Sequence, residues 1–281
     1  MAYNWYPGHM TRAKREMESD LKLIDLIIEL LDARAPMSTR NPDIDAMGAG
    51  KGRLVLLNKA DLADEAENRK WIQYFEEKGF TALALDSRNN KGMKAIDTSV
   101  QVACQEKIER NRKKGILNRP MRAMVVGIPN VGKSTFINSY ARRAVAKTGN
   151  KPGVTKGKQW VRLGKNLELL DTPGILWPKI ESDEAGFHLA VIGSMNDEVL
   201  NREDLLERFL KDMQIRYPSA LLDNYGISPE MSFREALEAA AEKRNALKPG
   251  GLPDTDRAVR FILDDFRGGR LGRITLDICE I

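Results

Sequence analysis

The stretch that decides the fold is Gly127-Ile-Pro-Asn-Val-Gly-Lys-Ser134. It fits the phosphate-loop pattern G-x-x-x-x-G-K-[ST], whose backbone curls so that successive amides face phosphate oxygens. The apolar segment Met124–Gly127 predicts a strand before the loop, and a helix is predicted after it from Lys133 to about Arg143. A strand, this loop and a helix in that order indicate an α/β domain that binds the phosphates of a nucleotide.

The residue types of the loop each have a part in this binding. Gly127 and Gly132 permit the tight backbone path, Lys133 supplies positive charge to the β- and γ-phosphates, and the Ser134 hydroxyl is the predicted Mg²⁺ ligand. An ordinary glycine-rich turn at a helix start is the alternative, but it leaves the Lys-Ser pair unexplained. The residues predicted to bind the phosphates are Asn130, Val131, Gly132, Lys133, Ser134 and Thr135.

Two later segments complete the predicted phosphate site. Asp171-Thr-Pro-Gly174 follows an apolar strand, so Asp171 is placed to hold Mg²⁺ through water and the Gly174 amide to sense the γ-phosphate. Between the two motifs, Lys151-Pro-Gly-Val-Thr155 ends in a hydroxyl. Thr155 is the candidate switch residue that closes on Mg²⁺ and the γ-phosphate. A plain turn before a strand remains the alternative for this segment.

A guanine-reading motif is predicted at Asn58-Lys-Ala-Asp61, at the end of a strand that begins near Arg53. The Asp61 carboxylate can accept hydrogen bonds from N1–H and the exocyclic amine of guanine, a donor pair that adenine lacks. Lys59 is expected to lie over the base, Asn58 to brace the phosphate loop, and Ser87 to make a second base contact. A strand-to-helix cap with an exposed Asp61 is the alternative.

The base-reading motif precedes the phosphate loop, which is the reverse of the usual order and predicts a circularly permuted domain. Such a permutation is tolerated when the original chain ends lie close together on the surface. The expected fold class is an α/β phosphate-loop GTPase domain with a mostly parallel sheet, buried on both faces and flanked by helices, and a smaller all-helical C-terminal domain. The strands expected in the first domain are Asp25–Leu31, Arg53–Leu57 and Ala82–Leu85, and Gln159–Leu163 is expected to form a hairpin with Leu167–Leu170. The sequence Asp64–Lys78 between the second and third strands is expected to be helical, and one connecting helix is expected over Ala95–Asn118.

From about Asp183 the pattern becomes helical, with segments separated by Pro and Gly. We expect three parts: residues 1–22 as an N-terminal helical segment that carries His9, residues 23–180 as the permuted GTPase domain, and residues 184–281 as a helical domain. The helices expected in the last part are Glu203–Met213, Phe233–Asn245 and Thr255–Phe266.

Composition and charge limit the other classes of protein. The 281 residues are 42% hydrophobic and 30% charged, and no apolar stretch is long enough to span a membrane. The N-terminus has no apolar secretory core, so we expect a cytoplasmic protein without a membrane partner. Cys104 and Cys279 lie far apart and predict no disulfide or metal site. A net charge of +5 and a pI near 9.1 permit a nucleic-acid partner without requiring one.

Several segments resemble the circularly permuted GTPases over nearly the whole chain. The resemblance implies a GTP- and GDP-binding enzyme that binds the immature large (50S) ribosomal subunit, contacts its rRNA through a helical RNA-binding domain, promotes a late assembly step and hydrolyses GTP faster there. It implies neither DNA binding nor a particular oligomeric state. The matching segments are Trp5-Tyr-Pro-Gly-His-Met10, Asp32-Ala-Arg-Ala-Pro-Met-Ser-Thr-Arg-Asn41, Gln159-Trp160, Leu170-Asp-Thr-Pro-Gly-Ile-Leu-Trp-Pro178 and Gly272-Arg-Ile274.

The residue that orients the attacking water is not in its usual place. Ras-like enzymes use a glutamine after the D-x-x-G loop, and this chain has Ile175 there. Of the two histidines, His188 lies in an apolar segment and is expected to be structural, whereas the resemblance supports His9 as the catalytic histidine. A surface histidine that caps the first helix is the alternative for His9. Asn130 resembles an asparagine with which some translational GTPases hold K⁺ beside the phosphates.

Three basic segments fit an RNA surface, because phosphate contacts supply most of the non-specific affinity for nucleic acids. A solvated linker helix is the alternative for the first of them. Two other functions remain open: a GTP-dependent switch for a non-ribosomal protein partner, and a module that binds GTP without hydrolysing it. The segments are residues 107–122, the arginines at 257, 260, 267, 270 and 273, and the group Arg12, Lys14 and Arg15.

Overall fold

The computed structural model describes residues 17, 19–117, 119–148, 160–163, 166–170, 174–175, 180, 182–195 and 201–280. Within these ranges, seven strands form one sheet in the order β3-β2-β1-β4-β6-β5, and β7 also pairs with β4. All pairs are parallel except the β5–β6 hairpin, which confirms the predicted hairpin and the mostly parallel sheet. The strands are β1 (Leu26–Asp32), β2 (Gly52–Asn58), β3 (Thr81–Ala84), β4 (Met121–Gly127), β5 (Trp160–Leu163), β6 (Leu167–Leu170) and β7 (Gly174–Ile175).

The sheet is buried on both faces, as the apolar strands predict. Successive side chains of a strand point to opposite faces, so β2 contributes to two clusters. Val55 and Leu57 pack with Trp71 of the helix α3, while Leu54 and Leu56 belong to the larger core. The helices of this part are α2 (Asp43–Met47), α3 (Glu65–Glu77), α4 (Ile96–Ala103), α5 (Gln105–Lys113) and α6 (Lys133–Thr148).

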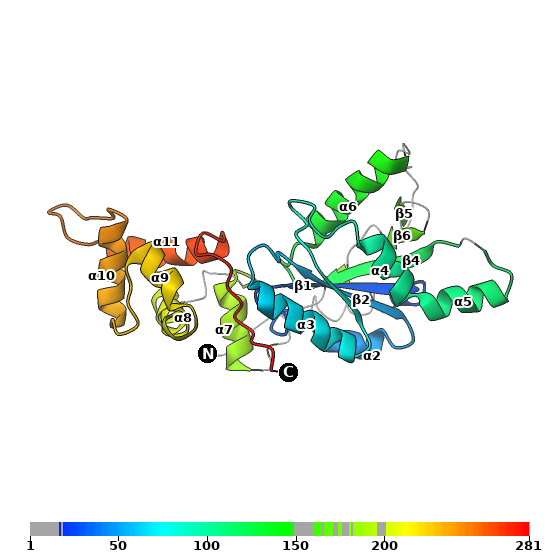
Figure 1. The fold of residues 1–281 in the computed structure, drawn as a ribbon, viewed down its shortest axis with the longest axis horizontal. Coiled ribbons are helices and arrows are strands. Elements are labelled where there is room, and N and C mark those ends of the chain that lie inside the picture. The colour runs from blue at the N-terminus through cyan, green and yellow to red at the C-terminus, as the bar shows by residue number, and fades with distance from the viewer. Residues whose placement is uncertain are drawn as a thin grey trace.

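The connecting segment after β3 differs from the prediction of one helix over residues 95–118. It forms two helices, α4 and α5, that meet at Cys104, which is 2% exposed. The break lets α4 bury Ile96 and Val100 against the sheet, while the charged α5 points away from it (Figure 1). A single straight helix could not place its apolar half on the sheet and its charged half away from the sheet.

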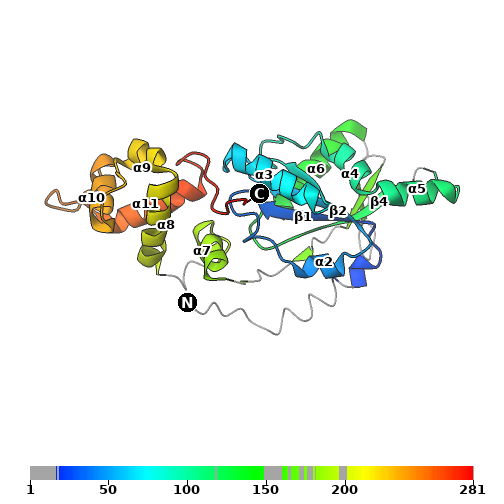
Figure 2. The ribbon, with the colours of Figure 1, turned by 60° about the horizontal axis from the view of Figure 1, so that its bottom comes forward.

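Residues 182–195 and 201–267 form a helical region that lies to one side of the sheet (Figures 1 and 2). Local signals explain its boundaries: α10 begins with a capping box between Ser232 and Glu235, and α9 has Pro218 in its first turn and ends at Gly226 in a left-handed conformation. The prediction missed α7 and α9. The helices are α7 (Asp183–Val191), α8 (Arg202–Arg216), α9 (Pro218–Tyr225), α10 (Phe233–Lys243) and α11 (Thr255–Arg267).

After α11 the chain returns to the sheet domain, and Figure 1 shows this C-terminal tail running back toward α3. The Ile274 amide donates to the Leu62 carbonyl at 3.0 Å, and the Cys279 amide donates to Oε2 of Glu67 at 3.1 Å. Ile274 and Cys279 are buried in these contacts. The tail therefore packs as part of the sheet domain, although it follows the last helix in sequence. No helix among the described residues has the length and apolar character to cross a membrane.

Candidate nucleotide-binding site

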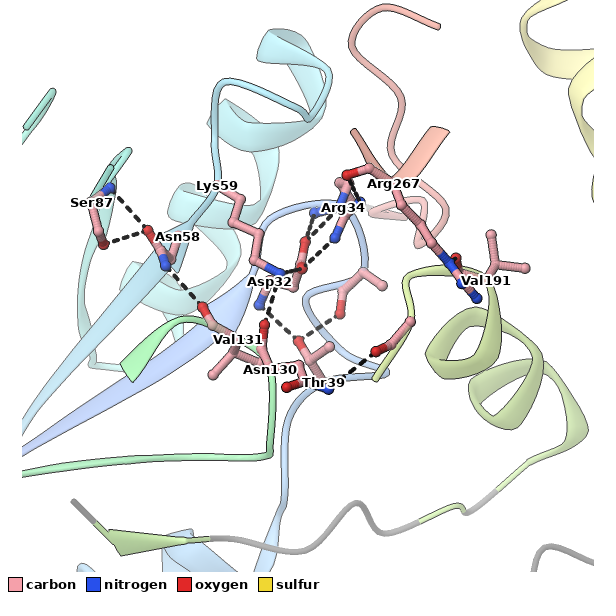
Figure 3. A network of polar contacts seen from close by, with 12 residues as sticks. Asp32, Arg34, Thr39, Asn58, Lys59, Ser87, Asn130, Val131, Val191 and Arg267 are labelled. Carbon is pink, nitrogen blue, oxygen red and sulfur yellow. Dashed lines mark hydrogen bonds and ion pairs between the residues drawn. The ribbon is translucent and has the colours of Figure 1, made fainter. Parts of the chain in front are cut away.

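The predicted site residues gather at one edge of the sheet, where parallel strands end. β1 ends at Asp32, β2 at Asn58 and β4 at Gly127, and the three strands are neighbours. In α/β proteins, ligands bind beyond the carboxyl ends of such strands. Figure 3 shows side chains from these strand ends meeting the phosphate loop. The permuted sequence therefore brings its base-reading motif and its phosphate loop together in space.

Asn58 links the base-reading segment to the phosphate loop. Its Nδ2 donates to the Val131 carbonyl at 2.8 Å, and its Oδ1 accepts from the amide and hydroxyl of Ser87 at 3.2 and 2.6 Å. The bracing contact predicted for Asn58 is therefore confirmed. A Cβ on Gly132 would lie 2.4 Å from Asn58 Nδ2, so only glycine fits there. Ser87 is buried on Asn58, and its predicted contact with the base stays a prediction.

Lys59 is held by two contacts in an uncommon backbone conformation. Its φ is 60°, its Nζ donates to the Asn130 carbonyl at 2.8 Å, and the same Nζ lies 2.8 Å from Oδ2 of Asp32. Positive φ in a non-glycine residue is concentrated at functional sites. Asp61, two residues later, is half-buried beside this lysine. The base-reading motif is thus set on a backbone that the surrounding contacts fix.

Asp32 is fully buried between two cations. Besides Lys59, it accepts from Nε and Nη2 of Arg34 at 2.9 and 2.8 Å. Burial alone raises the pKa of this carboxyl, but the Arg34 guanidinium and the Lys59 ammonium outweigh burial and hold the pKa well below its ordinary value. Asp32 is therefore a permanent anion at the edge of the site.

Asn130 of the phosphate loop faces the helical region. Its φ is 67°, and its Nδ2 donates to the Gly193 carbonyl, just after α7, at 3.2 Å. Asparagine tolerates this left-handed conformation better than most residues. The loop residue predicted to take part in nucleotide binding is thus also a contact with the helical region.

Lys133 and the residues after it form the start of α6. Lys133 Nζ donates to the carbonyls of Gly127 and Ile128 at 2.8 and 2.7 Å, and burial lowers its pKa to about 8. Ser134 and Thr135 are exposed at the helix N-terminus, where amides and the helix dipole favour anions. The arrangement is suited to phosphate groups, which would replace the loop carbonyls as partners of the ammonium.

Gly174 lies next to the strand that enters the phosphate loop. In β7, Gly174 pairs with Val126 and Ile175 pairs with Gly127, so Gly174 lies beside the start of the phosphate loop, and its contact with the γ-phosphate stays a prediction. No cluster of three acidic, His or Cys side chains that could hold a metal occurs among the described residues. The exposed Ser134 hydroxyl nevertheless fits Mg²⁺, a hard cation that prefers oxygen ligands, together with waters and phosphates. The predicted residues His9, Thr155 and Asp171 lie outside the described ranges.

His188 is structural, as expected. It is 3% exposed, and its Nδ1 lies 2.6 Å from Oδ1 of Asp277 and 3.0 Å from the Ser38 hydroxyl. Sequence reasoning missed Asp32 and Arg34 as site residues. The available signal was a pair of charged residues, Asp32 and Arg34, at the carboxyl end of a buried strand.

Comparisons with known proteins agree with this geometry. Residues 122–224 match the family described as 50S ribosome-binding GTPase. Ribosome biogenesis GTPase A of Bacillus cereus is 45% identical over 282 residues, covering 100% of this chain and 95% of that protein. The protein of the same name from Thermotoga maritima is 34% identical over 274 residues, covering 98% and 94%.

A solved structure has the same fold. GNP-bound YlqF from T. maritima matches with a TM-score of 0.67 and 30% identity, covering 96% of this chain and 99% of that chain. The relatives extend over the sheet domain, the helical region and the C-terminal tail alike. This chain is therefore a GTP hydrolase with a circularly permuted GTPase domain, and it belongs to the ribosome biogenesis GTPase A family.

Proposed function

We propose that this GTPase acts in the cytoplasm, binds the immature large (50S) ribosomal subunit and its rRNA, and promotes a late step of its assembly while converting GTP to GDP and phosphate. The observation that carries the proposal is similarity over the full chain to proteins named for ribosome biogenesis. The description of the matching family, which names the 50S subunit, supports the choice of partner. We assign residues 23–180 to the GTPase domain and 184–281 to the RNA- and ribosome-binding domain.

Guanine recognition is assigned to the end of β2 and the loop after β3. Asp61 accepts the two donors of guanine, Lys59 covers the base, and Ser87 both holds Asn58 and contacts the base. The contacts of Asn58 and Lys59 with the phosphate loop support this assignment, because they place the motif beside the predicted phosphates. Adenine lacks these two donors and would leave the Asp61 carboxylate unpaired, which makes an adenine nucleotide a poor ligand.

The exposed end of α5 is the strongest candidate for rRNA contact. Its last turn carries Arg110, Arg112 and Lys113, and Lys114 follows; all four are exposed on a helix that projects from the sheet domain (Figure 1). Elsewhere in the same basic segment, Lys107 and Arg119 pair with Asp25. Charges already paired within the protein contribute less to phosphate binding than free ones.

In the second basic set, the arginines between 257 and 273, fewer side chains are available for RNA than the sequence suggests. Arg267 donates to the carbonyls of Ala190 and Val191, and Arg270 pairs with Asp265. Arg257 and Arg260 stay exposed along α11 and extend the proposed RNA surface to the helical region. The third set lies in residues outside the described ranges.

Hydrolysis is assigned to His9, which would orient the attacking water. Ile175 has a hydrocarbon side chain, and the other histidine, His188, is buried on Asp277. His9→Ala should abolish GTP hydrolysis and leave GTP affinity nearly unchanged, measured by phosphate release and nucleotide titration. A loss of affinity instead would remove His9 from this role.

We assign Mg²⁺ to Ser134, Thr155 and Asp171, with Lys133 and the Gly174 amide stabilising the γ-phosphate. Asn130 is the candidate K⁺ ligand. A bound K⁺ would neutralise charge that develops on the phosphates, so hydrolysis should be faster in KCl than in NaCl of equal concentration. Equal rates would eliminate the K⁺ site.

Cosedimentation with large-subunit precursors tests the ribosomal partner. We expect binding with a non-hydrolysable GTP analogue and release with GDP. Changing Arg110, Arg112, Lys113 and Lys114 to Gln should weaken binding and flatten its dependence on salt. The matched control changes four exposed cations elsewhere in the sheet domain to Gln: Arg69, Lys70, Lys78 and Lys94.

Two outcomes would contradict this assignment. Equal losses in the charge variant and its control would move the rRNA contact away from α5. No binding to any ribosomal particle in either nucleotide state would favour the alternative, a GTP-dependent switch for a non-ribosomal protein.

A further inference from the structure

The nucleotide site and the helical region are joined by a closed set of contacts, which we call the coupling ring (Figure 3). Lys59 starts it by contacting both Asp32 and the Asn130 backbone. The Asn130 side chain then reaches Gly193, after α7. The members of the ring, in order, are Asp32, Lys59, Asn130, Gly193, Arg267 and Arg34.

The second half of the ring lies in the helical region. Arg267, the last residue of α11, donates through Nε to the Val191 carbonyl at 3.0 Å and through Nη2 to the Ala190 carbonyl at 2.8 Å. It also lies against Gly193, where a Cβ would be 3.3 Å from its Nε. The end of α7 is therefore held by α11 on one side and by Asn130 on the other.

Arg34 closes the ring. Its Nη1 lies 3.4 Å from the Arg267 carbonyl, its Nε and Nη2 bind Asp32, and its guanidinium lies over the ring of Phe266 at 5.4 Å from the centroid. Arg34 is 2% exposed, so these contacts take place away from water. Electrostatic contacts are stronger there than at the surface.

We propose that Asp32 is a positioning residue for Lys59, and that Arg34 couples this positioning to the end of α11. Nucleotide binding and the placement of the helical region then depend on each other, as linkage requires. Among the described residues, the side chain of Asp32 pairs with Arg34 and Lys59, and of these Lys59 belongs to the base-reading motif. The proposal rests on the assignment of Lys59 to the guanine base, and the experiment separates the two ideas.

A double-mutant cycle on Asp32 and Lys59 tests the positioning role, with GDP affinity of the full-length protein as the readout. Asp32→Asn and Lys59→Ala should each weaken GDP binding by about tenfold, and the double variant by no more than the larger single loss. A purely structural role for Asp32 would instead multiply the two losses. The matched control is Asp25→Asn, a buried acid just before the other end of β1 that pairs with Lys107 and Arg119 and should leave affinity unchanged.

The outcomes distinguish the two ideas. If Lys59→Ala leaves GDP affinity unchanged, the base assignment of Lys59 is wrong and this inference falls with it. If Lys59→Ala weakens binding while Asp32→Asn does not, or if the losses multiply, the base assignment stands and the positioning role is overturned.

Amide hydrogen exchange tests the coupling and does not depend on the folding of Asp32→Asn. GDP should slow exchange at the amides of Gly268, Gly269 and Arg270, which follow α11. Arg34→Lys keeps a positive charge beside Asp32 but lacks the planar fork that also reaches the Arg267 carbonyl. This variant should lose the GDP-dependent slowing. Equal slowing in the wild type and the variant, or no slowing in the wild type, would overturn the coupling.

Discussion

The two halves of the nucleotide site differ in how the protein holds them. On the base side, Asn58 and Lys59 are fixed by hydrogen bonds and an ion pair to other parts of the protein. On the phosphate side, the partners that the Lys133 ammonium has among the described residues are carbonyls of its own loop. Under the proposed assignment, a bound base would meet side chains that already have their partners, whereas Lys133 would exchange its loop carbonyls for phosphate oxygens. The contacts on the phosphate side would therefore change with the ligand, and those on the base side would not.

The largest effect is expected from Asp61→Asn on the base side. The variant should lose the preference for GTP over ATP, by about 10⁴-fold, because the carboxylate that accepts both guanine donors is gone. Competition between the two nucleotides measures this ratio. Asp61 is half-buried, so the thermal unfolding midpoint should stay close to that of the wild type. An unchanged preference would place the base reader elsewhere.

Lys133→Met tests the phosphate side, because it removes the ammonium that is assigned to the phosphates. We expect the affinity for a non-hydrolysable GTP analogue to fall by about a thousandfold, since charged hydrogen bonds to the β- and γ-phosphates are lost. The free energy of unfolding should change little, because the lysine is buried at a cost that its lowered pKa records. Nucleotide titration and urea unfolding give the two values. A stability loss as large as the affinity loss would mean that Lys133 is structural.

Asn58→Ala differs from Lys133→Met, because it should lower both the free energy of unfolding and the affinity for GDP. The variant leaves the Val131 carbonyl and the Ser87 hydroxyl without this partner, which costs about 1–3 kcal/mol of unfolding free energy, and GDP affinity should fall about tenfold. Asn224→Ala removes a contact within α9, to the Ala220 carbonyl, and is the control. It should leave GDP affinity unchanged; a similar loss in both variants would argue against a special role for Asn58.

The smallest effect is a pH dependence of GDP affinity. Lys133 must be protonated to bind phosphates, and its pKa in the free protein is lowered to about 8. Affinity should therefore fall as pH rises above 8, by at most about tenfold per unit, because binding then takes up a proton. The unfolded state holds its proton to a higher pH, so stability of the free protein should rise over the same interval.

Opposite pH trends of affinity and stability would exclude unfolding as the cause of weaker binding. Lys133→Arg is the control, since a guanidinium stays charged throughout this range. Its affinity should be independent of pH between 7 and 9. A wild-type affinity that is also constant would show that Lys133 remains charged in the free protein.

The sequence allowed the fold class and the phosphate loop to be predicted, because both depend on local patterns. The conformation of Gly127–Ser134 depends mainly on residues within the loop itself, and β1 and β2 are largely apolar apart from Glu29 and Arg53. The order of the motifs further predicted that the ends of β2 and β4, which are far apart in sequence, would lie close together. The hydrogen bond from Asn58 to the phosphate loop could be predicted for the same reason.

The remaining features depend on distant contacts. The break at Cys104 arises because α4 and α5 meet different surroundings, which a run of polar residues does not reveal. The coupling of Arg34 to Arg267 joins residues that are 233 positions apart. Charged residues at such positions look like ordinary surface charges in a sequence. Only the fold shows that Arg34 is buried and lies against the half-buried Arg267.

The C-terminal tail has a mechanical consequence for the whole molecule. Helices α8–α11 are connected to the sheet domain twice: through α7 at the beginning and through the tail that binds Leu62 and Glu67 at the end. The contact between Arg34 and Arg267 restrains the same helices at a third place. Cutting the chain after α11 would remove the tail attachment and leave every residue assigned to the nucleotide in place.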